Sequence, residues 1–160
     1  MAATTPCHCP EINDQDWHLK DQTWDGKFFY FEYVRHLFNV PLGYDKQLIA
    51  MKQDVTRKGY KFVNPDMVLY QPGAFQGRIF MEIEDPEQYD ANVETFDHAR
   101  MLSRVYKGSR SSSGAALQEL KAFTQDRTHL DPIVIYFWRV TCSKCAKTKG
   151  YEKTVLFARV

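Results

Sequence analysis

Hydrophobic positions along the chain form two similar series of predicted elements. In the first series, the apolar run at 27–38 predicts a strand, and apolar residues spaced i, i+3 and i+7 within 42–59 predict a helix. Two short apolar runs at 66–71 and 77–84 lie on either side of a Pro-Gly turn and predict a hairpin. The expected order of this half is strand, helix, strand, strand.

The second series repeats the same order. The run at 93–108 predicts a long strand with a bulge near 97–98, and the apolar side of 111–128 predicts a helix that follows a serine-rich cap region. The apolar runs at 131–140 and 151–160 then predict a closing hairpin. The chain therefore reads as an internal duplication.

Two such units can join into one sheet, because the helix of each unit covers only one sheet face. We predict an α+β fold: a duplicated β-α-β-β module with pseudo-twofold symmetry, an antiparallel sheet with two helices on one face and a groove on the other. The predicted boundaries are an N-terminal tail at 1–23 and one domain at 24–160, divided into module one (24–90) and module two (91–160). A concave junction between modules is a favoured place for a small-molecule site.

Composition narrows the function classes. The 160 residues are 44% hydrophobic and 26% charged with a net charge of +1, which is typical of a globular protein and argues against direct nucleic-acid binding. The sequence contains no apolar run of membrane-spanning length and no secretory leader, so we expect a cytoplasmic protein without a membrane partner. A homodimer stays open. The aromatic content of 14% predicts rings in the core or around a cavity.

The cysteines form two close pairs near opposite ends of the chain, Cys7 with Cys9 and Cys142 with Cys145. In a reducing compartment such pairs are read first as thiolate ligands, and four thiolates satisfy a closed tetrahedral zinc site. We therefore predict a structural zinc ion that pins the N-terminal tail to the second pair. Whether His8 replaces one cysteine stays open.

Two alternatives to zinc are unligated surface thiols and a redox-active C-x-x-C pair. The second pair is expected at a hairpin tip, between the apolar runs at 131–140 and 151–160. A reactive thiol usually lies where a helix begins, because the helix dipole lowers its pKa there. The redox alternative is therefore the weaker one.

The element order and lengths over 24–160 resemble those of the GyrI-like (gyrase-inhibitor-like) effector-binding domains. The resemblance implies a groove between the modules that binds apolar, often cationic molecules with aromatic walls and a buried glutamate. Some stand-alone members of that family resemble hydrolases of small reactive natural products. This chain departs from the family pattern, since Ile135 or Tyr136 stands where the glutamate of the penultimate strand would fall.

Strand alternation assigns residues to the expected groove. In the first strand we expect the set of Phe29, Phe31 and Tyr33 to pack under the helices, which leaves the other set for the groove. The residues predicted to bind a ligand are aromatic or acidic: Tyr30, Glu32, Tyr70, Glu82, Tyr136 and Trp138. The alternatives are a solvated edge for the acids and ordinary core packing for the rings. His36 and His98 are candidate general bases, although a single histidine near a strand end is usually at the surface or in the core.

Three functions remain open from the sequence. The first is a binding module for an apolar or cationic small molecule. The second is a hydrolase in the same groove, in which Glu82 or Glu32 activates water. The third is a zinc-stabilised interaction protein without a ligand. The sequence contains no phosphate-binding glycine loop, no G-x-S-x-G and no H-E-x-x-H, so no reaction is indicated by a motif.

Overall fold

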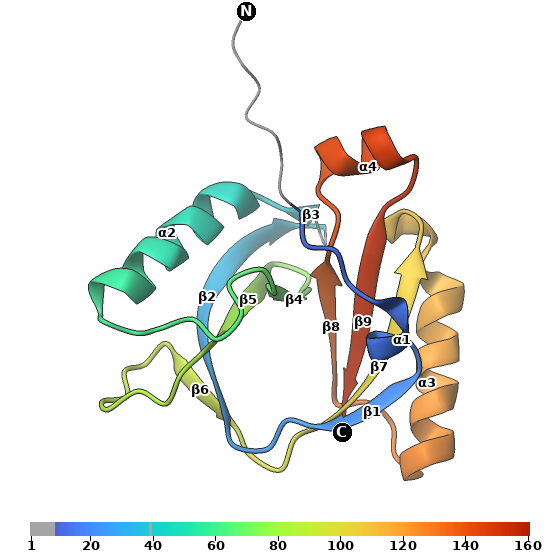
Figure 1. The fold of residues 1–160 in the computed structure, drawn as a ribbon, viewed down its shortest axis with the longest axis horizontal. Helices are drawn as coiled ribbons and strands as arrows, with labels where there is room; N and C mark the ends of the chain where they lie inside the picture. The colour runs from blue at the N-terminus through green and yellow to red at the C-terminus, as the bar shows by residue number, and fades with distance from the viewer. Residues whose placement is uncertain (1–8, 39) are drawn as a thin grey trace, which may run out of the picture.

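The computed structural model describes residues 9–38 and 40–160, and its elements follow the duplicated order (Figure 1). Module one runs β2 (Lys27–Leu37), α2 (Tyr44–Arg57), β4 (Leu69–Gln71) and β5 (Gln76–Ile83). Module two runs β7 (Arg100–Lys107), α3 (Gly114–Thr128), β8 (Val134–Arg139) and β9 (Lys153–Arg159). The predicted α+β fold with two β-α-β-β modules is confirmed.

The remaining elements are short. They are α1 (Asp14–Trp17), β1 (Lys20–Thr23), β3 (Val40–Pro41), β6 (Val93–Phe96), a 3-10 turn η1 (Arg110–Ser112) and α4 (Ser143–Lys149). The strands form one antiparallel sheet in the order β1-β7-β9-β8-β4-β5-β2-β3, and β6 pairs with the first residues of β2 on the edge away from β5. The predicted strand over 93–108 is divided into β6 and β7, and His98 between them has a φ of 51°, which no regular strand accommodates.

The two modules meet in the middle of the sheet, where β4 lies beside β8. Leu69 faces Trp138 and Tyr70 faces Phe137 in this pairing. On each side of this junction the strands follow in mirrored order, β4-β5-β2 and β8-β9-β7, which is the arrangement expected of a pseudo-twofold axis.

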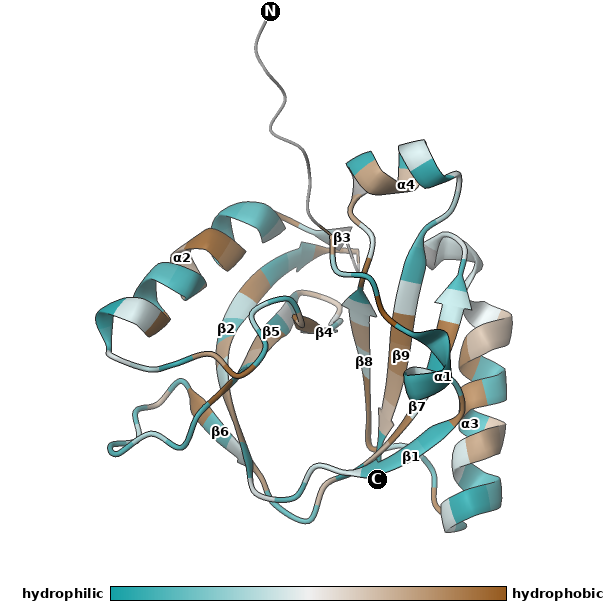
Figure 2. Ribbon diagram, in the orientation of Figure 1, coloured by the Kyte–Doolittle hydropathy of each residue, from teal (hydrophilic) through white to brown (hydrophobic). Residues whose placement is uncertain are grey.

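Both helices lie on the outer side of the curled sheet (Figure 1). The apolar side of α2 buries Met51 and Val55 in a cluster that includes Met81 of β5. The apolar side of α3 buries Leu120 in a second cluster that includes Leu156 of β9. Figure 2 shows that the outward sides of both helices are largely polar, as an amphipathic surface helix requires.

The inner face of the sheet carries the largest apolar cluster. Its buried aromatic side chains, each no more than 9% exposed, are Trp24, Phe29, Phe31, Phe80, Phe96, Tyr136, Trp138 and Phe157. Neighbouring rings pack closely, with a centroid distance of 4.2 Å between Phe29 and Phe96. Arg159 makes a cation–π contact with this cluster, because its guanidinium lies 4.2 Å from the centre of the Phe96 ring. These rings form a core.

The predicted faces of β2 are reversed in the structure. Tyr30 and Val34 pack in the cluster beneath α2, whereas Phe29 and Phe31 belong to the cluster on the inner face. Both faces of β2 are buried, so alternation divides its residues into two sets without showing which set lies under the helix. Glu82, Tyr136 and Trp138 were assigned to the sheet face away from the helices, and this agrees with the structure, since Met81 beside Glu82 packs beneath α2 and Tyr136 lies on the inner face.

The N-terminal segment contributes to the sheet and its core. Strand β1 pairs antiparallel with β7, and the ring of Trp17 contacts that of Trp138 at a centroid distance of 5.3 Å. This segment belongs to the predicted tail at 1–23, although residues 1–8 lie outside the described residues. The described part of the chain contains no helix both long and apolar enough to cross a bilayer.

Candidate functional site

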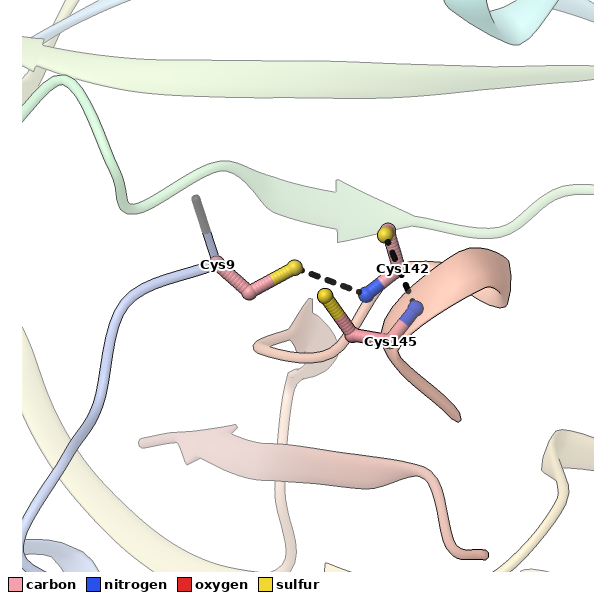
Figure 3. A group of neighbouring side chains, drawn as sticks. All are labelled: Cys9, Cys142 and Cys145. Carbon is pink, nitrogen blue, oxygen red and sulfur yellow. Dashed lines mark hydrogen bonds between the residues drawn. The ribbon is translucent and has the colours of Figure 1, made fainter. Parts of the chain in front are cut away.

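Three cysteines from distant parts of the sequence come together in the structure (Figure 3). Cys9 precedes α1, while Cys142 and Cys145 lie at the start of α4, and the three Sγ atoms all lie within 4.8 Å of one another. The backbone N–H of Cys142 donates to Cys9 Sγ at 3.2 Å, and that of Cys145 donates to Cys142 Sγ at 3.5 Å. Three sulfur atoms this close together can serve as ligands of one metal ion.

The segment around the second cysteine pair joins β8 to β9, as predicted for a hairpin tip, but the pair opens a helix there, which the sequence did not predict. It forms the helix α4, with Cys142 as its N-cap residue and Gly150, at a φ of 78°, as its C-cap. The thiol of Cys142 accepts the Cys145 N–H in the place usually taken by a serine or aspartate oxygen, so the sequence carries no ordinary cap signal. The predicted ligand Cys7 and its alternative His8 lie outside the described residues.

A pocket of about 490 Å³ lies on the helix-covered side of the sheet. Both modules contribute to it: α2 and β4 from module one, and β7, β8, β9 and the loop before α3 from module two. Its aromatic walls are Tyr44, Tyr70, Tyr106 and Phe137. Its volume falls in the range of ligand sites, and its position at the junction of two modules is one that such sites favour.

The described lining of this pocket includes hydroxyl groups and charged groups of both signs. Asp45 and Glu152 supply carboxylates, and Arg139 donates to Glu152 Oε1 at 3.3 Å. Burial raises the pKa of Tyr44 to about 12, and the nearby charge of Asp45 acts in the same direction. The Tyr44 hydroxyl therefore keeps its proton at neutral pH and can donate a hydrogen bond.

A buried histidine lies behind Tyr70. His36 is 5% exposed, its Nδ1 lies 2.8 Å from the carbonyl oxygen of Val34, and its Nε2 is hydrogen-bonded to the Tyr70 hydroxyl. The two rings are nearly parallel, with planes that differ by 20° and centroids 5.5 Å apart. A side chain at Gly77 would displace this histidine, because its Cβ would lie 2.3 Å from His36 Cε1.

The structure places the predicted ligand-binding residues in three locations. Tyr70 lines the pocket between the modules. Tyr136, Trp138 and Glu82 lie on the inner face, where Lys27 pairs with Glu82 at 3.0 Å. Tyr136 accepts a hydrogen bond from Arg159 at 3.4 Å, and the indole of Trp138 donates to a backbone carbonyl.

Tyr30 and Glu32 form part of a polar network near the C-terminal end of α2. Lys58 donates to the Tyr30 hydroxyl at 2.8 Å and pairs with Asp90 at 2.7 Å, while that hydroxyl donates to Glu32 at 3.4 Å. Burial raises the pKa of Tyr30, and burial together with the charge of Asp54 raises that of Glu32. The structure therefore does not bring the predicted acids and rings together in one groove.

Sequence reasoning missed most of the pocket lining because it looked on the uncovered sheet face. Phe137 points to the side of the sheet that carries the helices, opposite to Tyr136 and Trp138, but the helices leave this part of the sheet uncovered. The signal was present in the duplication, because two helices on one face need not cover the strands between them. Tyr44 and Tyr106, at the start of a helix and the end of a strand, mark the rim of that gap.

Three comparisons with known proteins bear on this chain. The sequence profile of a family described as "Bacterial hydrolase" matches residues 1–160. No protein with a curated description matches the sequence significantly. Among solved structures, the "Crystal structure of EcmrR C-terminal domain" is similar with a TM-score of 0.63 and 11% sequence identity, over 89% of this chain and 96% of that chain. This likeness shows the fold, which is GyrI-like.

Proposed function

We propose that this chain, which belongs to the bacterial hydrolase family whose profile spans residues 1–160, binds an apolar or cationic small molecule in the pocket between its modules. The observation that carries the proposal is the pocket itself, about 490 Å³ in volume and lined by aromatic rings from both modules. Most of its walls are apolar, so burying an apolar ligand there is favourable.

The charge of the pocket supports cations over anions. Among the lining residues whose side chains the structure describes, Asp45 and Glu152 carry carboxylates, and the guanidinium of Arg139 pairs with Glu152. The faces of aromatic rings attract a cation in the same way. Of the residues predicted from the sequence to bind the ligand, this proposal retains Tyr70.

Hydrolysis of the bound molecule is the second candidate, and the family match favours it. The chemistry needs a group that activates water and a pocket that holds the substrate beside it. The predicted bases do not line the pocket: Glu82 pairs with Lys27 on the inner face, and Glu32 lies near the end of α2. Any water-activating group must therefore come from the pocket lining and the residues behind it.

We further propose that Cys9, Cys142 and Cys145 bind a structural zinc ion. Zinc–sulfur bonds of about 2.3 Å place thiolates of a tetrahedral site roughly 3.8 Å apart, which small side-chain rotations can reach from the present separations of up to 4.8 Å. Zinc would fix the N-terminal segment against α4. The fourth ligand is proposed to be Cys7 or His8.

Two fluorescent probes test the binding function, the cation ethidium and the neutral N-phenyl-1-naphthylamine. We expect saturable binding of both, and a Ser111→Trp substitution at the exposed rim of the pocket should weaken both at least about tenfold, or 1.4 kcal/mol. Lys121→Trp, on the exposed side of α3, is the matched control and should bind normally.

A second pair of measurements tests the ligand class. Glu152→Gln should weaken ethidium while leaving the neutral probe unchanged, because only the cation gains from the carboxylate. Binding that is unaffected by Ser111→Trp, or the absence of saturable binding by either probe, would contradict the proposed site.

A further inference from the structure

Two carboxylates lie among the described residues that line the pocket between the modules, those of Asp45 and Glu152. A hydrolytic reaction needs a group that takes a proton from water, and enzymes use imidazoles and carboxylates most often for this step. The described lining contains no histidine, which leaves these two acids. Asp45 is exposed in the first turn of α2, whereas Glu152 is partly buried directly before β9. Glu152 therefore lies closer to the strands that form the floor of the pocket.

The sheet directs the side chain of Glu152 into the pocket. Side chains alternate along a strand, and Thr154 and Leu156, two and four residues further along, also line the pocket. The backbone carbonyl of Glu152 accepts a hydrogen bond from the N–H of Gly108 at 2.9 Å, which continues the pairing of β7 with β9 up to this residue. Glu152 therefore belongs to the same face of the sheet as the pocket floor.

The contact with Arg139 locates the carboxylate itself. Arg139 lines the pocket from β8, and its Nη2 donates to Glu152 Oε1 at 3.3 Å, so the ends of the two side chains meet above the floor. The second oxygen, Oε2, has no hydrogen-bond partner among the described residues, and 31% of the Glu152 side chain is exposed. A water molecule in the pocket can therefore donate to this oxygen.

The strand residues of the floor lie in two rows that run across the sheet. The first row is apolar and is paired in register across β4, β8 and β9: Tyr70, Phe137 and Leu156. The second row is polar and is paired in register across β8, β9 and β7: Arg139, Thr154 and Tyr106. Two residues of strand separate the rows by about 7 Å, and Glu152 lies beyond the polar row. A molecule with an aromatic group on the first row extends its polar part toward Glu152.

We propose that Glu152 is the catalytic residue that takes the proton from water in the hydrolytic reaction, and that the substrate is an ester of an aromatic alcohol. The inference rests on the hydrolytic candidate above. The apolar row holds the aromatic group, and the acyl carbon of the ester then lies beside the carboxylate. Holding water and ester together in this way lowers the entropic part of the barrier.

The reaction balances without a further reactant. As the water oxygen attacks the acyl carbon, one of its O–H bonds breaks and the proton passes to Glu152 Oε2. The electron pair of the water oxygen forms the new bond to carbon, and the π electrons of the carbonyl group move to its oxygen. When this tetrahedral intermediate collapses, the carbonyl group forms again and the bond from carbon to the alcohol oxygen breaks. That oxygen takes the proton from Glu152, which returns to its carboxylate form.

Hydrolysis of 1-naphthyl acetate and binding of N-phenyl-1-naphthylamine by the same proteins test the inference. Glu152→Gln keeps the size and polarity of the side chain but cannot take a proton from water. Its kcat should fall by roughly 10²–10⁴-fold, the usual contribution of general base catalysis, while KM and the Kd of the naphthylamine change less than about threefold. Glu152→Ala should lose activity similarly and regain part of it with added formate, which supplies a carboxylate in the space that the side chain leaves.

The matched control is Glu87→Gln, at an exposed residue outside the pocket, which should retain full activity. A kcat within threefold of wild type in Glu152→Gln would overturn the assignment. A parallel loss of hydrolysis and naphthylamine binding without rescue by formate would overturn it too, since Glu152 would then have a structural role. A wild-type protein that binds the naphthylamine without hydrolysing the ester would overturn the inference and leave the binding function intact. A wild-type protein that does neither would contradict the proposed function itself.

Measurements on the wild-type protein cover the case in which the variants unfold. Because a proton moves in the step that Glu152 assists, kcat should be lower in D₂O than in H₂O, and equal values would overturn the inference. The naphthylamine should inhibit hydrolysis competitively, since both molecules occupy the same pocket. Hydrolysis that the naphthylamine does not inhibit would place the reaction elsewhere and would also overturn the inference.

Discussion

Cys9 accepts a hydrogen bond from the backbone N–H of Cys142 at 3.2 Å, across 133 residues of sequence. The contact joins the N-terminal segment to the start of α4, and Cys145 completes the cluster. If this cluster binds zinc as proposed, the ion closes a loop that spans nearly the whole chain. Loss of the ion should then release the segment that packs on the inner face through Trp17.

Zinc content provides the first prediction. The purified protein should hold about one zinc ion per chain. Cys142→Ser should lose the ion, because only two thiolates of the described cluster would be left to bind it. Thermal unfolding should shift downward by roughly 2–4 °C for each kcal/mol lost. Lys144→Ser, an exposed neighbour in α4, is the control and should keep both zinc and melting temperature. A wild-type protein that contains no zinc and has the same melting temperature as Cys142→Ser would contradict the site.

The fourth ligand is the subject of the second prediction. Cys7→Ser and His8→Ala should differ, since only one of the two side chains completes a tetrahedral site. The variant that removes the ligand should bind zinc more weakly in a competition with a chromogenic chelator. Equal affinity in both variants would mean that water or another residue supplies the fourth position.

The aromatic cluster of the inner face gives the third prediction. Phe96 is fully buried and stacks on Phe29, so Phe96→Ala should lower the free energy of unfolding by about 3–5 kcal/mol. Phe75→Ala is the matched control, because Phe75 is 81% exposed, and it should change stability by less than about 0.5 kcal/mol. Urea denaturation measures both. A small loss in Phe96→Ala would show that the inner face is an open cavity.

Gly77 supports His36 by having no side chain, which gives the fourth prediction. In Gly77→Ala the new Cβ would lie 2.3 Å from His36 Cε1 and 2.5 Å from the backbone oxygen of Gln71. We expect a loss of about 1–3 kcal/mol of stability, as for other overpacked sites. Gly114→Ala, where no atom lies within 4 Å, should be neutral or slightly stabilising, and a similar result for both would mean that the sheet yields readily around His36.

The ion pair between Lys58 and Asp90 gives the fifth prediction. Burial alone would raise the pKa of Asp90, but hydrogen bonds from Lys58 and the Asn92 backbone lower it overall. The depressed pKa stabilises the fold above the unfolded value of about 3.9, and this stabilisation disappears as pH falls through the folded value.

Asp90→Asn should therefore cost about 1 kcal/mol at pH 7, and this cost should disappear as pH falls through the lowered pKa of Asp90, because the wild-type carboxylate is then protonated as well. Urea denaturation across this pH range measures the difference between the two proteins. A difference that stays constant with pH would assign the cost to packing rather than charge.

The fold was predictable because duplication is visible in element order, which needs no knowledge of side-chain contacts. The position of the pocket was not predictable. Strand alternation shows which residues share a face of the sheet, but it does not show which part of a face the helices leave uncovered. Tyr30 illustrates the difference: its place in β2 was correct and its face was not. The helix at Ser143–Lys149 escaped detection because its cap is a cysteine and it has no apolar stripe.

His36 shows a second limit of prediction from the sequence. Its position near the end of β2 is consistent with an exposed residue, and only the close approach of Gly77 and Tyr70, 41 and 34 residues away, encloses it. The cysteine cluster was easier to predict, because two thiol pairs with the spacing of metal ligands indicate a metal site whatever secondary structure surrounds them. Here the position between the paired strands β8 and β9 was right, the helix in that connection was not predicted, and the clustering of Cys9, Cys142 and Cys145 was right.

The junction of β4 with β8 is short, with Leu69 facing Trp138 and Tyr70 facing Phe137. A molecule in the pocket would touch Tyr70 on one side of this junction and Phe137 on the other. Its contacts would have to break before the two halves of the sheet could separate. Occupancy should therefore slow hydrogen–deuterium exchange of the backbone amides along β4 and β8, because the ligand would hold the two modules together on the helix side as the inner-face rings do on the other side.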